Sequence, residues 1–207
     1  MSKTDNRQKA LSAKVALRSA AIEHVKRARV LDVFAGIDGV MHDLVWRRAE
    51  FYAGIDIEYQ FSQDARRRYV GDSLRVLRNI DLSMFNIFDV DAYGDPWGAL
   101  TIIAKRRRWL PGELGAIVIT DGGMARTKFG QASAAIAALT GVRSMPSGKE
   151  TADALRRQCR AAWLSLADVE LVAAREAISK SGDSGGSLVM AYTLLAIQGR
   201  AAEVLAP

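Results

Sequence analysis

The stretch "VLDVFAGIDG", Val30 to Gly39, gives the strongest indication of how this chain folds. It opens as a compact apolar run, which is typical of a buried strand. Gly36 and Gly39 follow at the point where that strand ends, and glycine lets a backbone turn tightly and approach a ligand closely. The segment "DGVMHDLVWRRAE" then has helical periodicity. The stretch therefore predicts a strand, a glycine turn and a helix.

Strands and helices alternate beyond this stretch. We expect further strands at "FYAGIDIE", "RYVGD", "FNIFDVD" and "GAIVITDGG". Helical segments separate them at "SQDARRR", "SLRVLRNI" and "PWGALTIIAKRRRWL", the last of which opens with proline at a helix start. Such alternation predicts a parallel sheet that is covered by helices on both faces.

The C-terminal part follows a different pattern. Residues 150–166 are expected to be helical, with Leu155, Cys159, Trp163 and Leu166 on one face. Two strands then follow, "VELVAAREAISK" and "SLVMAYTLLAIQ", joined by "SGDSGG", which is a hairpin signal. The expected fold is therefore α/β, a Rossmann-like doubly wound sheet of seven strands, mostly parallel with one antiparallel C-terminal strand.

The 207 residues suit a single domain. Within it we separate residues 1–27, a polar tail and an amphipathic helix over residues 8–27, from the main domain at 28–207. Apolar residues at helical spacing place one face of that helix toward a core: Leu11, Val15, Ile22 and Val25.

Composition excludes several classes. One cysteine forms no internal disulfide, and together with two histidines it argues against a His/Cys metal site. Apolar runs are too short to span a membrane, and the polar N-terminus lacks the apolar core of a signal peptide. We therefore expect a cytoplasmic protein with no metal and no membrane partner.

The net charge of +6, from 29 basic and 23 acidic residues, bears on the partner. Basic residues cluster at Arg66–Arg68, Lys105–Arg108 and Arg156–Arg157. One interpretation is a polyanion partner such as nucleic acid. The alternative is solvated helix faces whose arginine stems cover apolar surface.

The glycine turn predicts a nucleoside ligand. Ligands of open parallel sheets bind at the carboxyl ends of the strands. Asp56 ends the second strand, twenty positions beyond Gly36, where a carboxylate can accept hydrogen bonds from ribose hydroxyls. The pattern is G-x-D-G, and Asp38 puts negative charge where a pyrophosphate would lie. A nucleoside without phosphates is therefore favoured, against the alternative of an ordinary strand–turn–helix.

The end of the fourth strand, "FDVDAYGDPW", carries candidate catalytic groups. An exocyclic base amine is a poor nucleophile, and a carboxylate that accepts its N–H bonds can orient the lone pair and ease proton loss. An aromatic ring can stack on the base. Asp91 and Tyr93 supply these two groups, with Asp89 beside them, and Asp121 ends the fifth strand similarly. Turn and cap chemistry would explain the same aspartates.

These motifs together resemble class I S-adenosylmethionine-dependent methyltransferases. "VLDVFAGIDG", "GIDIE", "GDSLRVL" and "FNIFDVDAYGDPW" follow the order of motifs in that family, over about residues 28–198. The resemblance implies S-adenosylmethionine as the cofactor. It implies that Asp56 binds the ribose hydroxyls and that Asp72 and Ser73 lie at the adenine amino group. The methionine end would be lined by Asp32, Ala35 and Gly36, whereas Asp38 stands where many members carry glycine.

The stretch "DVDAYG" narrows the expected substrate. It resembles the D-x-D-P-Y-G motif of tRNA guanine N2-dimethyltransferases and, more distantly, the D-P-P-Y motif of DNA amino-methyltransferases, with Ala92 in place of proline. This implies methyl transfer to a base amine of DNA or RNA. Two alternatives stay open: a methyltransferase acting on a small molecule or protein, and a non-enzymatic nucleic-acid-binding or assembly module. A protein partner that supplies specificity and the oligomeric state are open too.

Overall fold

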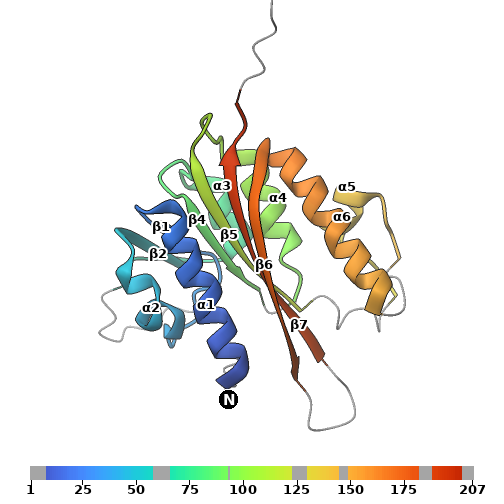
Figure 1. Ribbon diagram of the computed structural model, residues 1–207, viewed down its shortest axis with the longest axis horizontal. Coiled ribbons are helices and arrows are strands. Elements are labelled where there is room, and N and C mark those ends of the chain that lie inside the picture. The colour runs from blue at the N-terminus through green and yellow to red at the C-terminus, as the bar shows by residue number, and fades with distance from the viewer. Residues whose placement is uncertain are drawn as a thin grey trace, which may run out of the picture.

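A computed structural model describes residues 8–57, 66–92, 94–122, 130–144, 149–181 and 188–201. Within these ranges seven strands form one sheet in the order β3-β2-β1-β4-β5-β7-β6 (Figure 1). The strands are β1 (Arg29–Asp32), β2 (Phe51–Asp56), β3 (Arg68–Val70), β4 (Ile87–Asp91), β5 (Leu114–Asp121), β6 (Val169–Ser181) and β7 (Leu188–Gly199). The helices are α1 (Gln8–Val25), α2 (Val40–Leu44), α3 (Ser73–Asn79), α4 (Trp97–Arg106), α5 (Ala134–Thr140) and α6 (Lys149–Ala167), with a 3-10 turn η1 (Trp46–Arg48).

The strand directions confirm the expected fold class. Strands β1 to β5 pair in parallel, and β7 is antiparallel to both of its neighbours, β5 and β6. The chain proceeds from β1 outward through β2 and β3, and then returns to β4 on the other side of β1. The carboxyl ends of β1 and β4 therefore form the topological switch point, where open α/β sheets bind ligands.

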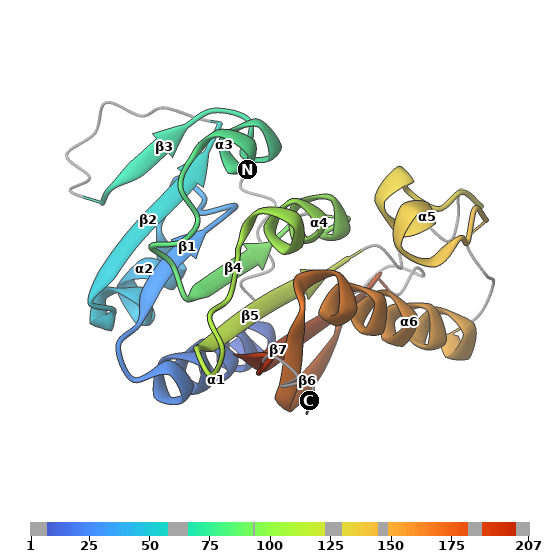
Figure 2. The same cartoon turned by 90° about the horizontal axis from the view of Figure 1, so that it is seen from above.

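Helices cover both faces of the sheet. Seen from above, α1 and α2 lie on one side, and α3, α4 and α6 lie on the other (Figure 2). In β4, Ile87 packs into the core under α1, whereas Phe88 and Val90 pack into the core under α3, α4 and α6. Because successive side chains of a strand point to opposite faces, Asp89 and Asp91 face α1.

Helix α1 buries a different stripe from the one that its apolar residues predict. Leu11, Val15 and Ile22 are only partly covered. The buried residues of the stripe follow helical spacing and include two cations: Ala10, Lys14, Leu17, Arg18, Ala21 and Val25. Small alanines let the helix approach β5 and β7 closely, and the acids of β4 compensate the charges of the two buried cations.

Other expectations differ in detail. The segment expected to be helical at "SQDARRR" lies partly outside the described residues, and Arg68, at its end, begins strand β3. Helix α5 was not expected, and its Ser133 cap accepts a hydrogen bond from the Ile136 amide. In the part of the chain that the structure describes, no helix is long and apolar enough to cross a membrane.

Candidate active site

Carboxylates gather at the carboxyl edge of the sheet. Asp32, Asp56, Asp91 and Asp121 are the last residues of β1, β2, β4 and β5, respectively. Asp89 lies two residues before Asp91 and is the ladder partner of Asp32 on the neighbouring strand β1. The fold therefore brings the acids of separate sequence motifs to one edge.

Asp32 lies inside the protein at the end of β1. It is 2% exposed, and its Oδ2 accepts a hydrogen bond of 3.2 Å from the Tyr52 hydroxyl on β2. Burial, together with the negative charge of Asp89, raises the pKa of Asp32 well above its ordinary value. This carboxyl group favours a cationic ligand, because such a ligand stabilises the charged form.

The glycine loop turns tightly against β2. Gly36 and Gly39 both adopt positive φ angles, 66° and 63°, which glycine adopts without a steric penalty. The Ala35 amide donates to the Ile55 carbonyl at 3.0 Å. A Cβ on Gly36 would stand 3.2 Å from Asp38 Oδ1, so the exposed Asp38 carboxylate lies directly beside the turn.

Two of the expected adenine-site residues also organise the local fold. Asp72 is the N-cap of α3, and its Oδ1 accepts a 2.8 Å hydrogen bond from the Arg75 amide. Ser73 is buried, and its hydroxyl donates to the Val33 carbonyl at 2.7 Å. The Ser73 hydrogen bond joins the start of α3 to the residue after β1, and the half-buried Asp56 lies at the end of β2.

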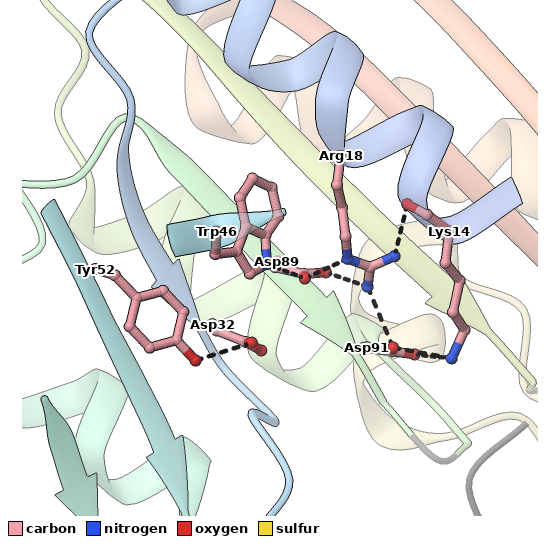
Figure 3. A network of polar contacts seen from close by, with 7 residues as sticks. All are labelled: Lys14, Arg18, Asp32, Trp46, Tyr52, Asp89 and Asp91. Carbon is pink, nitrogen blue, oxygen red and sulfur yellow. Dashed lines mark hydrogen bonds and ion pairs between the residues drawn. The ribbon is translucent and has the colours of Figure 1, made fainter. Parts of the chain in front are cut away.

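Helix α1 inserts two cations between itself and the acids of β4 (Figure 3). Arg18 binds Asp89 with two charged hydrogen bonds, Nε to Oδ2 at 2.6 Å and Nη2 to Oδ1 at 2.7 Å. Its Nη2 also reaches Asp91 Oδ2 at 3.1 Å. Lys14 Nζ contacts both oxygens of Asp91, at 3.0 and 3.3 Å. Paired guanidinium–carboxylate bonds of this kind fix the orientation of the acid.

The two acids differ in exposure. The Asp89 side chain is fully buried, and Trp46 Nε1 donates to its Oδ2 at 2.9 Å. The Asp91 side chain keeps 18% of its surface exposed. Asp91 is therefore the β4 carboxylate with surface that a ligand can reach, and Asp89 is held beneath it.

The same cations set the ionisation of these acids. Burial raises the pKa of Asp89 despite the opposing charge of Arg18. Burial would also raise the pKa of Asp91, but the charges of Arg18 and Lys14 outweigh it and hold that pKa below its ordinary value. Asp91 is thus an ionised hydrogen-bond acceptor at neutral pH and a weak base.

The sequence placed these acids at the ends of strands, as the structure has them, but it did not predict their partners. Lys14, Arg18, Trp46 and Tyr52 were not among the expected site residues. The available signal was the helical spacing that aligns Lys14 and Arg18 with Leu17 and Ala21 on one face. Tyr93, expected to be catalytic, lies outside the described residues.

The basic clusters lie in different environments. Arg107 is buried, donates to the Phe85 carbonyl at 3.0 Å and pairs with Glu113. Arg106 donates to two carbonyls, one in the last turn of α3 and one just after it. That cluster ends α4 and precedes β5, at the amino edge of the sheet. By contrast, Arg66 donates to the Ile37 carbonyl at 2.9 Å, beside the glycine loop.

Asp121 ends β5 inside the protein, 6% exposed. The negative charge of Asp121 acts on Cys159 of α6, which lies nearby. Burial, with a smaller contribution from Asp121, raises the pKa of the Cys159 thiol to about 12. That thiol therefore stays protonated and is a poor nucleophile.

Solved structures share this architecture. Trm1 from Pyrococcus horikoshii, solved with S-adenosyl-L-methionine, matches with a TM-score of 0.53 and 16% identity, over 93% of this chain and 56% of that one. A SAM-dependent methyltransferase from Archaeoglobus fulgidus matches with a TM-score of 0.51 and 14% identity, over 92% of this chain and 95% of that one. TYW2 from M. jannaschii, in complex with AdoMet, matches with a TM-score of 0.54 and 10% identity, over 96% of this chain and 80% of that one.

The chain has the fold of class I S-adenosylmethionine-dependent methyltransferases. This confirms the fold that the ordered motifs implied. The chain spans little more than half of the Trm1 chain. No family model and no curated protein matches the sequence.

Proposed function

We propose that this protein is an S-adenosylmethionine-dependent methyltransferase that acts on a base amine of DNA or RNA. The observation that carries the proposal is Asp91: a partly exposed, ionised carboxylate, fixed by Lys14 and Arg18 at the end of β4. It lies at the switch point, across from the glycine loop that follows β1. Such a carboxylate can accept the N–H of an amine and orient its lone pair.

The residues at this edge suit the cofactor. The turn at Gly36 leaves the backbone accessible, and the buried Asp32 carboxyl favours the ammonium group of a methionine end. Asp56 would bind the ribose hydroxyls, and the exposed Asp72 would accept from the adenine amino group. Bound there, the cofactor would supply a methyl group that is already activated on a sulfonium. Two of the structural neighbours were solved with this cofactor.

The strand-four residues would then divide the work of binding an acceptor. Asp91 would orient the amine, and Tyr93 would stack on the base. Asp89, which is fully buried between Arg18 and Trp46, would act by holding that arrangement. A base within a duplex would have to flip out of the stack to reach Asp91.

The proposal of a nucleic-acid partner rests on the positive charge of the protein. The net charge of +6 favours a polyanion, and Arg66 places a guanidinium beside the glycine loop. A single cysteine suits the reducing cytoplasm, where we place the protein.

The test begins with calorimetric titration of the full chain with S-adenosylmethionine and S-adenosylhomocysteine, where one-to-one binding is expected. A labelled-methyl screen over DNA and RNA follows, with Asp91→Asn as the variant. We expect Asp91→Asn to lower methyl transfer by about a hundred-fold or more while cofactor affinity stays the same. Unchanged turnover in that variant would remove the role given to Asp91. No binding at millimolar cofactor would contradict the enzyme itself.

A further inference from the structure

The Lys14 ammonium group forms an ion pair with Asp91, the carboxylate that the proposed acceptor amine must contact. Its Nζ lies 3.0 and 3.3 Å from the two oxygens of Asp91 and 5.5 Å from the centre of the Tyr192 ring. The lysine side chain is 7% exposed, so its stem packs between α1 and the sheet. The Asp91 charge is therefore already neutralised by a fixed cation before any substrate arrives.

This arrangement distinguishes two kinds of amine. An alkylamine, such as a lysine side chain or a polyamine, is an ammonium ion at neutral pH and would meet Lys14 at the same carboxylate. Two like charges about 4 Å apart at a protein surface repel strongly enough to weaken binding by roughly a thousand-fold. An exocyclic base amine is neutral and donates N–H bonds without that repulsion. It also needs no deprotonation before it attacks.

We propose that Lys14 is a specificity-determining residue, which makes the site accept a neutral amine and reject an alkylammonium ion. The inference rests on the proposed function, because it assigns the class of acceptor to the same Asp91 site. Arg18 cannot provide this selection by itself, since its guanidinium is fully buried and directed mainly at Asp89. Lys14 contacts both oxygens of Asp91, whereas Arg18 reaches only Oδ2, and the Asp91 side chain keeps 18% of its surface exposed.

The test compares Lys14→Met with Lys26→Met, a matched control. Methionine keeps the buried apolar stem of Lys14 and removes its charge, whereas Lys26 lies exposed just after α1. The first readout needs no turnover: the 13C carboxylate signal of Asp91, assigned with Asp91→Asn, is followed during titration with n-butylammonium. We expect n-butylammonium to bind at least ten-fold more tightly to Lys14→Met than to the wild type, and equally to Lys26→Met and the wild type.

The second readout is labelled-methyl transfer to a single-stranded oligonucleotide of all four bases and to n-butylamine. Lys14→Met should raise the ratio of kcat/KM for n-butylamine over the oligonucleotide at least ten-fold. Equal n-butylammonium binding to wild type and Lys14→Met would overturn the inference. If Lys14→Met does not fold, Lys14→Gln replaces it with the same expected outcomes. The wild type could transfer no methyl group to the oligonucleotide while n-butylammonium still binds more tightly to Lys14→Met than to the wild type. That result would contradict the proposed function and still support the charge selection by Lys14.

Discussion

Replacing Arg18 with methionine tests the central charge network most directly. The substitution keeps an unbranched apolar stem and removes a guanidinium that is fully buried. Asp89 would lose both of its bonds to Arg18 and keep the 2.9 Å bond from Trp46. Asp91 would lose its bond to Arg18 but would keep its ion pair with Lys14. The main consequence is therefore one buried carboxylate without a cation.

The size of the effect follows from that burial. Removing one partner of a buried ion pair costs about 3–5 kcal/mol, because the remaining charge is left without compensation. Asp89 is 0% exposed, so water does not replace the guanidinium. We expect Arg18→Met to lower the free energy of unfolding by about 3–5 kcal/mol at pH 7. This is a large share of the stability of an ordinary domain.

The assay is urea unfolding of the wild type, Arg18→Met, Asp89→Asn and the double variant. Asparagine removes the charge that Arg18→Met leaves unpaired, so the double variant should be more stable than the sum of the single losses predicts. Arg27→Met is the control, because the Arg27–Glu50 pair is exposed and should matter little. A loss below about 1 kcal/mol at pH 7, with additive single effects, would refute the reasoning.

The pH dependence gives a second check on the same variant. Burial already raises the pKa of Asp89, so the folded state binds this proton more tightly than the unfolded state does. Without Arg18 that pKa rises further. Protonation then removes the unpaired charge, and the stability difference between Arg18→Met and wild type should shrink as the pH falls from 7 toward 5. A difference that grows on acidification would contradict this account.

Two further predictions concern the cofactor site. The pKa of Asp32 is raised by burial, and a bound ammonium favours its ionised form, so S-adenosylmethionine should bind more tightly as the pH rises, with proton release. Calorimetry from pH 5.5 to 7, where the α-amino group of the ligand stays protonated, should show this dependence in two buffers. Asp32→Asn should abolish it, and the same pH dependence of binding in the wild type and Asp32→Asn would contradict the assignment. Gly36→Ala should cost about 1–2 kcal/mol from its positive φ and also weaken cofactor binding. Gly130→Ala introduces a side chain at a similar positive φ, and no atom of the described residues lies within 4 Å of the new Cβ, so this variant should leave cofactor affinity unchanged.

Much of the fold could be predicted because its signals are local. The apolar run before Gly36 became β1, and the glycine became a turn with positive φ. The alternation of strands and helices gave the parallel sheet, and the two long C-terminal segments gave the antiparallel β6 and β7. The position of Asp32, Asp56 and Asp91 followed as well, since the carboxyl ends of parallel strands meet at one edge.

The partners of these acids had no local signal. Arg18 and Asp89 are 71 residues apart in the sequence, and Lys14 and Asp91 are 77 apart. Lysine and arginine are rarely buried unless they are paired, so apolar spacing pointed to the neighbouring face of α1. The α1 face with Lys14 and Arg18 can be buried because β4 places two carboxylates opposite it.

The network also bears on where the functional unit begins. A boundary at residue 27 separates α1 from the sheet, yet α1 supplies both cations that neutralise Asp89 and Asp91. A sheet without α1 would leave Asp89 buried without a cation. Asp91 would then lie close to two buried acids, Asp32 and Asp89, with no positive charge to compensate them. Without those cations the pKa values of Asp89 and Asp91 would rise, and a protonated Asp91 could no longer accept the N–H of the amine that it is proposed to orient. We therefore infer that α1 belongs to the same unit as the sheet, and that the cations of the first helix neutralise the acidic edge at which methyl transfer is proposed.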